Sequence, residues 1–473
     1  MRISTVGCCV VAYMALIMPA VGQSADGPGR ITMNVREPSE VTVARQAQLA
    51  LDGVCAADGP GAAVLIAKGD RVIFRGARGR AEIELGVPLS ADNVFRIASV
   101  TKMFTAAMIL KLAEAGKLSV DDSLAAYLSD FPNAGSITIR ELLNHTSGVS
   151  DVVKDPQPGF SRRDVNVNTL VAEIQKRPLD FAPGTRMAYS NAGFILLGAV
   201  IEKVTGEPWQ VAIEKEILGP LGLRHTQYGA SSPLIPGRAA GYSTESRTGI
   251  VKNASFISIT TPASAGALVS TVDDLRLWMR DLISGQVVGK RSFEQMMTPG
   301  PDLPGTRAAS RYGLGMYVWK VRGTRMIGHT GQIDGFASAV GYLPERDITV
   351  VVLANDDNFD AQTMGRRMAA IALGEPYTDL VPVRAAEGEL LSLAGTYQWD
   401  ENTIETLSVK DGRLYAQRGN RNVIPLQMTA QSELHFAPDE LSYFVPVRDV
   451  AGAVIGLDYF EGGDPPAKRL PRK

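Results

Sequence analysis

The stretch FRIASVTKMF, residues 95–104, carries a serine and a lysine three positions apart at the head of a long apolar segment. From Ser99 to Ala115 the apolar residues cover most of a helical circumference, and Gly116 ends the pattern. This pattern predicts a helix that is buried on nearly every side. A serine at such a helix start is most often an N-cap. Lys102 changes the interpretation, because a buried lysine carries a costly charge.

Ser99 and Lys102 would lie on one face of the predicted helix, because side chains three residues apart are neighbours there. Burial disfavours the ammonium form and lowers the pKa of a lysine, and a neutral amine can take the proton of a serine hydroxyl. Free N–H groups at the helix start also stabilise developing negative charge. The sequence therefore predicts Ser99 as a nucleophile and Lys102 as its candidate base, although a Ser-x-x-Lys spacing alone is weak evidence.

A second stretch, MAYSNAG at residues 187–193, places a phenol and an amide directly before another predicted helix. The phenol of Tyr189 can relay protons near a lysine, and the amide of Asn191 can hold a substrate amide. The alternative is a core tyrosine followed by an ordinary N-cap asparagine.

A third stretch, GHTGQIDGF at residues 328–336, closes a predicted strand. Gly331 would let a substrate backbone approach the strand edge closely. His329 and Thr330 could then offer hydrogen bonds to an acid group or a leaving group. The alternative is a plain turn after a strand.

The order Ser-x-x-Lys, Tyr-x-Asn and His-Thr-Gly resembles the serine β-lactamase and penicillin-binding-protein superfamily. The branch it resembles contains class C β-lactamases, D-alanyl-D-alanine carboxypeptidases, D-aminopeptidases and related esterases. The surrounding segments, such as ITIRELLNHTSGVSD and FAPGTRMAYSNAGFILLGAVIE, are similar too, and the likeness covers residues 61–355. In the first of these segments, HTSG with His145 is interpreted as structural.

The resemblance implies an acyl-enzyme formed on Ser99, with proton transfer shared by Lys102 and Tyr189. Which of these two is the general base stays open. The substrate-binding residues would be Asn191, His329, Thr330, Gly331 and Gln332. Backbone N–H groups of Ser99 and Gln332 would form the oxyanion hole.

The chain departs from the pattern of true β-lactamases at the third motif, because they usually carry a lysine where this chain has His329. A permanent positive charge for a β-lactam carboxylate is therefore missing. We expect hydrolysis of D-amino-acid peptides or small esters; the alternatives are a β-lactamase and a penicillin-binding sensor without turnover. No cofactor or metal is expected, because none of the four histidines forms a His-Glu-x-x-His motif and no glycine-rich phosphate loop occurs. An α/β-hydrolase is disfavoured by the lack of a Gly-x-Ser-x-Gly elbow.

The N-terminus has the pattern of an export signal. Arg2 precedes an apolar run at residues 6–20, and small residues follow at 20–22. Residues 1–22 are therefore expected to be a signal peptide, and the protein periplasmic or secreted, without a membrane span after cleavage. The alternative is an uncleaved anchor. Cys55 would be the one cysteine of the mature chain, which excludes an intramolecular disulfide.

The remaining pattern predicts an α+β, β-lactamase-like domain at residues 23–385. Strand-like segments occur at its start and again at residues 313–355, with helices between, which suggests an antiparallel sheet flanked by helices plus a helical region. Short alternating strands from 386 to 473 predict a small C-terminal β-barrel, which resembles a lipocalin-like barrel. The formal net charge of -2 gives no footprint for nucleic acid. The expected partner is a small-molecule or peptide substrate, and oligomerisation through the C-terminal domain stays open.

Overall fold

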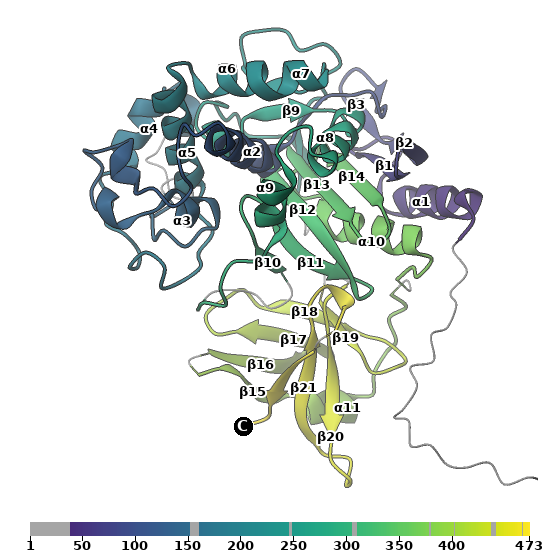
Figure 1. The fold of residues 1–473 in the computed structure, drawn as a ribbon. Helices are drawn as coiled ribbons and strands as arrows, with labels where there is room; N and C mark the ends of the chain where they lie inside the picture. Colours follow the sequence, from purple (N-terminus) through teal and green to yellow (C-terminus); the bar gives the residue numbers. More distant parts are fainter. Residues whose placement is uncertain are drawn as a thin grey trace, which may run out of the picture. The chain divides into compact units, whose positions relative to one another are not determined.

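A computed structural model describes the chain from residue 38 onward (Figure 1). The described residues are 38–151, 160–245, 248–304, 310–377, 380–401, 403–436, 441–465 and 467–473. The predicted signal peptide at residues 1–22 lies outside them. Within these ranges, no helix combines the length and the apolar character needed to cross a bilayer.

The central sheet has seven antiparallel strands in the order β10-β11-β12-β13-β14-β1-β2. Its two halves come from opposite ends of the domain, because β1 pairs with β14 from Ala62↔Ala354 to Lys68↔Ile348. This confirms the predicted antiparallel sheet. The strands are β1 (Ala62–Lys68), β2 (Arg71–Arg78), β10 (Ser310–Tyr312), β11 (Tyr317–Val321), β12 (Thr324–Ile333), β13 (Phe336–Leu343) and β14 (Ile348–Ala354).

Helices cover both faces of this sheet. One face packs against α1 (Glu40–Val54) and α10 (Ala361–Leu373). The alternate side chains of the same strands join the core that contains α2 (Thr101–Glu114) and α8 (Val272–Ser284). Val350 belongs to the first core and Val351 to the second, which follows from the period of two along a strand. A sheet buried on both faces explains the nearly continuous apolar run of β14.

The helical region holds the segment that carries Ser99. The sequence predicts a helix from Ser99 onward, whereas the structure has a 3-10 turn, η1 (Ala98–Val100), before α2 (Thr101–Glu114). The observed α-helix begins two residues later than predicted. Ala98 has a left-handed φ of 45°, which turns the chain sharply after strand β5 (Phe95–Arg96). The predicted burial of α2 is confirmed, and Phe104 stacks on Trp278 of α8 with ring centroids 3.9 Å apart. The other helices are α3 (Ile139–Leu143), α4 (Val167–Ile174), α5 (Asn191–Thr205), α6 (Trp209–Ile213), α7 (Gly219–Leu221), α8 (Val272–Ser284) and α9 (Lys290–Met297), and the short strands are β3 (Arg80–Glu82), β4 (Val87–Pro88), β5 (Phe95–Arg96), β6 (Gln227–Tyr228), β7 (Tyr242–Thr244), β8 (Val251–Asn253) and β9 (Leu268–Ser270).

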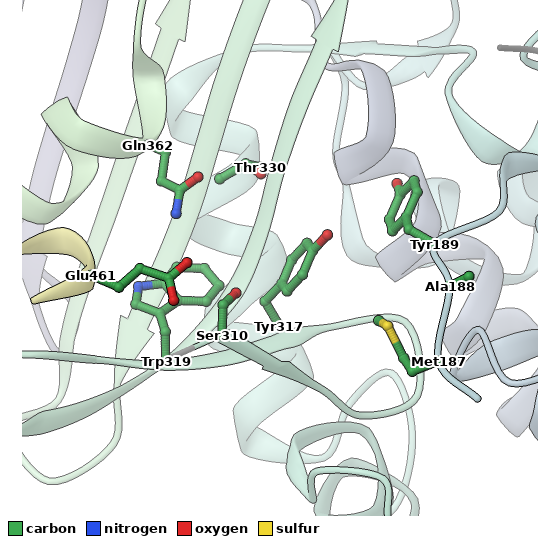
Figure 2. Close-up of a pocket in the computed structure, with 9 residues that line it drawn as sticks. All are labelled: Met187, Ala188, Tyr189, Ser310, Tyr317, Trp319, Thr330, Gln362 and Glu461. Atoms are coloured by element: carbon green, nitrogen blue, oxygen red, sulfur yellow. The ribbon is translucent and has the colours of Figure 1, made fainter. Parts of the chain in front are cut away.

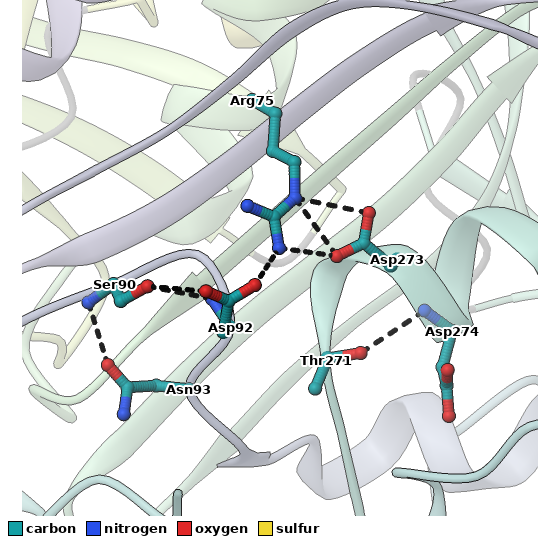
Figure 3. A network of polar contacts seen from close by, with 7 residues as sticks. All are labelled: Arg75, Ser90, Asp92, Asn93, Thr271, Asp273 and Asp274. Atoms are coloured by element: carbon teal, nitrogen blue, oxygen red, sulfur yellow. Dashed lines mark hydrogen bonds and ion pairs between the residues drawn. The ribbon is translucent and has the colours of Figure 1, made fainter.

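A surface network of charges joins β2 to the first turn of α8 (Figure 3). Arg75 donates to Asp273 over 2.7 Å and also contacts Asp92. Asp273 lies at the positive end of the α8 dipole, where a carboxylate is favoured. Because the carboxylates are exposed, the network contributes little to stability, and it holds neighbouring elements in register.

The C-terminal strands follow one another in sequence order and form a nearly closed eight-stranded barrel, which confirms the predicted β-barrel. The first and last strands meet where Tyr397 bridges Arg472 and where Lys473 N–H donates to the Thr396 carbonyl over 2.9 Å. A helix, α11 (Glu387–Leu393), precedes the barrel. The strands are β15 (Gly395–Asp400), β16 (Thr403–Lys410), β17 (Arg413–Arg418), β18 (Ile424–Met428), β19 (Leu434–Phe436), β20 (Tyr443–Arg448), β21 (Val454–Phe460) and β22 (Lys468–Pro471). The domain limits 23–385 and 386–473 stay predictions.

Candidate active site

Ser99 lies at the tight turn between β5 and α2, directly beside strand β12. A Cβ atom at Gly331 of β12 would come within 2.5 Å of the Ile97 carbonyl oxygen and 2.9 Å of the Ser99 nitrogen. Only glycine therefore lets the strand run this close to the serine. Ala98 adopts its φ of 45° at the same turn, which is an uncommon conformation for alanine and typical of functional turns. Local backbone geometry thus brings together the first and third sequence motifs.

Lys102 is completely buried, and its amine lies among three oxygen atoms. Nζ is 3.1 Å from Ser99 Oγ, 2.8 Å from Asn191 Oδ1 and 2.8 Å from the Ala265 carbonyl oxygen. The last two oxygens accept hydrogen bonds and cannot donate them. A neutral amine would satisfy both with its two N–H groups and would turn its lone pair toward the serine hydroxyl. The site therefore suits a lysine that takes a proton from Ser99.

The side-chain amide of Asn191 is oriented by a carboxylate. Its Nδ2 donates to Asp151 Oδ2 over 3.1 Å, which turns Oδ1 toward Lys102. Asn191 is the first residue of α5, and the hydroxyl of Ser190 caps that helix by accepting from Gly193 N–H. Sequence reasoning missed Asp151, although it ends the quoted segment HTSGVSD.

Tyr189 completes the contacts of the serine, because its hydroxyl is hydrogen-bonded to Ser99. The centre of its ring lies 4.9 Å from Lys102 Nζ. Desolvation of the hydroxyl, helped by Tyr317 and Asp151, raises the pKa of Tyr189 well above its ordinary value, although part of the ring stays open to a pocket. The phenol is therefore protonated at neutral pH. This direction favours Lys102 over Tyr189 as the resting base, with Tyr189 as a proton donor.

His145 holds the main chain on both sides of Tyr189. Its carbonyl accepts from Ala188 N–H over 3.0 Å, and its Nδ1 accepts from Ser190 N–H over 3.2 Å. The imidazole also packs on the tyrosine ring, with centroids 4.3 Å apart. The HTSG segment is thereby joined to the second motif.

His329 takes a different position from the one expected. Its side chain is 1 % exposed, and its Nε2 lies 2.8 Å from the Tyr312 hydroxyl. Since Nδ1 faces the Thr330 carbonyl at 2.5 Å, Nδ1 carries the proton and Nε2 accepts from the tyrosine. Burial is the largest cause that lowers the pKa of His329 to about 3, so the imidazole is neutral at neutral pH. The imidazole of His329 is therefore hydrogen-bonded to Tyr312 inside the protein and does not face open solvent.

A cavity of about 310 Å³ opens beside Tyr189 and Thr330 (Figure 2). Successive residues of a strand face opposite sides, so Thr330 reaches this cavity while His329 is turned away. Gln332, further along β12, is exposed and donates its side-chain amide to the Asp357 carbonyl over 2.6 Å. The residues that line the cavity are Met187, Ala188, Tyr189, Ser310, Tyr317, Trp319, Thr330, Gln362 and Glu461.

The described ranges hold no group of three or more His, Cys, Asp or Glu residues that could bind a metal ion.

The sequence and the fold of this chain are similar to those of known proteins. Residues 46–373 match the profile of the family described as Beta-lactamase. Protein flp of Staphylococcus aureus (strain N315) is 28% identical over 302 residues, which are 63% of this chain and 59% of that protein. The chain thus spans about three fifths of the length of this relative. Penicillin-binding protein 4* of Bacillus subtilis (strain 168) is 27% identical over 398 residues, 79% of this chain and 86% of that protein. Among solved structures, a D-stereospecific amidohydrolase from Streptomyces sp. has a TM-score of 0.62 and 30% identity, covering 70% of this chain and 99% of its own.

Proposed function

This chain belongs to the Beta-lactamase family, whose members are serine hydrolases, and on that premise we propose that it cleaves amide or ester bonds through an acyl-enzyme on Ser99. The observation that carries the proposal is the buried Lys102 amine, 3.1 Å from Ser99 Oγ and held by two further acceptors. Such a base beside a hydroxyl is the usual arrangement for activating a weak nucleophile.

In the proposed acylation step, Ser99 Oγ attacks the substrate carbonyl carbon while its proton passes to Lys102 Nζ. The carbonyl oxygen gains negative charge and is stabilised by backbone N–H groups of Ser99 and Gln332. As the tetrahedral intermediate collapses, Tyr189 protonates the leaving group and recovers a proton from Lys102. Water then attacks the acyl carbon and gives a proton to Lys102. As the second tetrahedral intermediate collapses, the bond between Ser99 Oγ and the acyl carbon breaks, the carboxylic acid leaves, and that proton passes to Ser99 Oγ.

We assign the substrates to D-amino-acid peptides or small esters. The neutral state of His329 supports this, because no cation stands at that position for the carboxylate of a β-lactam. The similarity to the Streptomyces amidohydrolase supports it as well. A β-lactamase and a penicillin-binding sensor are the alternatives. The apolar run at residues 6–20 further supports export to the periplasm or the medium.

The test is one substrate panel combined with intact-mass spectrometry. Wild type, Ser99→Ala and the control Ser129→Ala, which changes an exposed serine, are incubated with p-nitrophenyl acetate, a D-alanyl-D-alanine peptide and nitrocefin. We expect wild type and Ser129→Ala to turn over the ester or peptide faster than nitrocefin, and Ser99→Ala to lose activity by at least 1000-fold. A nitrocefin kcat/KM above the other two would overturn the substrate assignment. A penicillin adduct that never decays, without turnover of any substrate, would identify a sensor.

A further inference from the structure

We propose that His145 is a positioning residue for Tyr189 and that it acts by holding the main chain on both sides of that tyrosine. The inference rests on the proposed function, because it concerns the proton that Tyr189 gives to the leaving group. His145 would affect catalysis through Tyr189 and not by contact with the reacting atoms.

His145 is hydrogen-bonded to alternate residues of the segment that carries Tyr189. Its carbonyl oxygen accepts from the Ala188 N–H over 3.0 Å, and its Nδ1 accepts from the Ser190 N–H over 3.2 Å. Ser190 has an extended backbone, with a φ of -135° and a ψ of 121°. In an extended segment, the N–H groups of alternate residues point to the same side. His145 therefore pairs with this segment as a neighbouring strand would, with an imidazole nitrogen in the place of a second carbonyl.

The contact with Ser190 depends on an acceptor inside the protein. His145 is 2 % exposed and Ser190 is 4 % exposed. Because Nδ1 accepts, the proton of the neutral imidazole lies on Nε2. Removal of the acceptor would leave the Ser190 N–H unpaired in the interior, which is costly. The main chain next to Tyr189 would then shift toward another acceptor.

The main chain at His145 has a conformation that ordinarily belongs to glycine. His145 follows Asn144, the C-cap of α3, and has a left-handed φ of 64°. The Thr146 N–H donates to the Glu141 carbonyl over 2.9 Å, which is the outer bond of a Schellman motif. Glycine is usual at this position of the motif, because a Cβ atom is strained there. A histidine in this position accepts local strain, which points to a function of its side chain.

The imidazole also packs against the aromatic rings that surround the catalytic groups. Its centre lies 4.3 Å from the centre of the Tyr189 ring, 4.5 Å from that of Tyr312 and 5.3 Å from that of Phe194. Lys102 Nζ lies 4.9 Å from the centre of the Tyr189 ring and 5.5 Å from that of Phe194. The place of the Tyr189 ring near the lysine amine thus depends on His145 through side-chain packing as well as through the main chain.

The experiment separates the ring of His145 from its acceptor nitrogen. His145→Phe keeps an aromatic ring without the acceptor. His145→Asn keeps an acceptor near the position of Nδ1 and tolerates a left-handed φ. His145→Gly suits the left-handed φ and removes both ring and acceptor, so it gives the same comparison if phenylalanine is not accommodated. Urea midpoints measure how well each variant folds.

The substrates are the p-nitrophenyl ester and the p-nitroanilide of D-alanine, which share their acyl group. The ester leaving group needs no proton, whereas the anilide nitrogen must be protonated. We expect His145→Phe and His145→Gly to lower kcat/KM for the anilide about tenfold more than for the ester, because a displaced acid hinders only the anilide. His145→Asn should restore most of the anilide rate, even where its urea midpoint is lower than that of wild type.

Two controls show whether the loss passes through Tyr189. In the Tyr189→Phe background no phenol is left to position, so the addition of His145→Phe should leave the ratio of the two rates unchanged. His225→Phe makes the same substitution at an exposed histidine and should keep the wild-type ratio.

Equal losses for anilide and ester in His145→Phe and His145→Gly would overturn the inference while the hydrolase proposal stands. An anilide-specific loss in His145→Asn as large as in His145→Phe would overturn it as well, because the acceptor would then have no role. Failure of wild type to hydrolyse either substrate, together with no adduct on Ser99, would instead overturn the proposed function.

Discussion

The buried imidazole of His329 makes stability depend on pH in a defined window. Its pKa in the folded chain is about 3, below its ordinary value of 6.5, so the unfolded chain binds more protons between these values. The free energy of unfolding therefore rises with pH across this window and gains nothing more from His329 above pH 6.5. Lowering the pH from 6.5 to 4.5 should remove about 2 kcal/mol, since one pH unit corresponds to at most about 1.4 kcal/mol and the unfolded histidine is only half protonated at pH 6.5.

The perturbation that isolates this effect is His329→Gln. A glutamine amide can still contact the Tyr312 hydroxyl, but it does not titrate. Urea unfolding at pH values from 7.0 to 4.5 measures wild type, His329→Gln and the control Ser129→Ala, which changes an exposed serine that does not titrate. Many carboxylates also titrate in this range, so the informative quantity is the difference between each variant and wild type at each pH.

We expect His329→Gln to be less stable than wild type at pH 7 and to lose that disadvantage progressively as the pH falls. Ser129→Ala, which removes no titrating group, should follow wild type in parallel. Parallel curves for wild type and His329→Gln would refute the reasoning, because they would mean that the imidazole is protonated as easily in the folded chain as in the unfolded one.

Three further substitutions test how the site is held together. Asp151→Ala should lower kcat about tenfold or more with little change in urea midpoint, because the Asn191 amide loses its orientation; Asp151→Asn should restore part of the rate. Gly331→Ala should reduce kcat/KM by at least 100-fold, because its Cβ would push β12 away from Ser99, and a wild-type rate would contradict that packing. Tyr189→Phe should slow amides more than p-nitrophenyl esters, whose leaving group needs no proton; equal losses for both would exclude it as the acid.

The parts of the fold that the sequence predicts well are those with a strong local period. The helix around Phe104 is apolar on every side, and the strand that contains Val350 is apolar throughout, so burial follows directly. The α-helix begins at Thr101 and not at Ser99 as predicted. The turn before it depends on the left-handed φ of Ala98, and an alanine in the sequence does not indicate such a conformation. Local pattern thus identifies an element but not the exact turn that begins it.

The candidate site divides in the same way. Ser99 and Lys102 are three residues apart, so their contact could be predicted from the Ser-x-x-Lys motif. The contact of Asp151 with Asn191 joins positions 40 residues apart, and the contact of His145 with Ser190 joins positions 45 residues apart. Neither contact leaves a periodic trace in the sequence. The direction of the His329 ring depends on which face of β12 meets Tyr312, and that is set only when the sheet assembles.

The central claim is that Lys102 activates Ser99 as the nucleophile, and time-resolved intact-mass spectrometry with peptide mapping tests it most directly. Wild type and Lys102→Met, which keeps the length of the buried side chain without a titrating group, are mixed with a p-nitrophenyl ester and quenched at successive times. The account predicts an acyl group on the peptide that contains Ser99, formed at least 100-fold more slowly in Lys102→Met. An acyl group on another residue, or formation at the wild-type rate without the lysine, would contradict it.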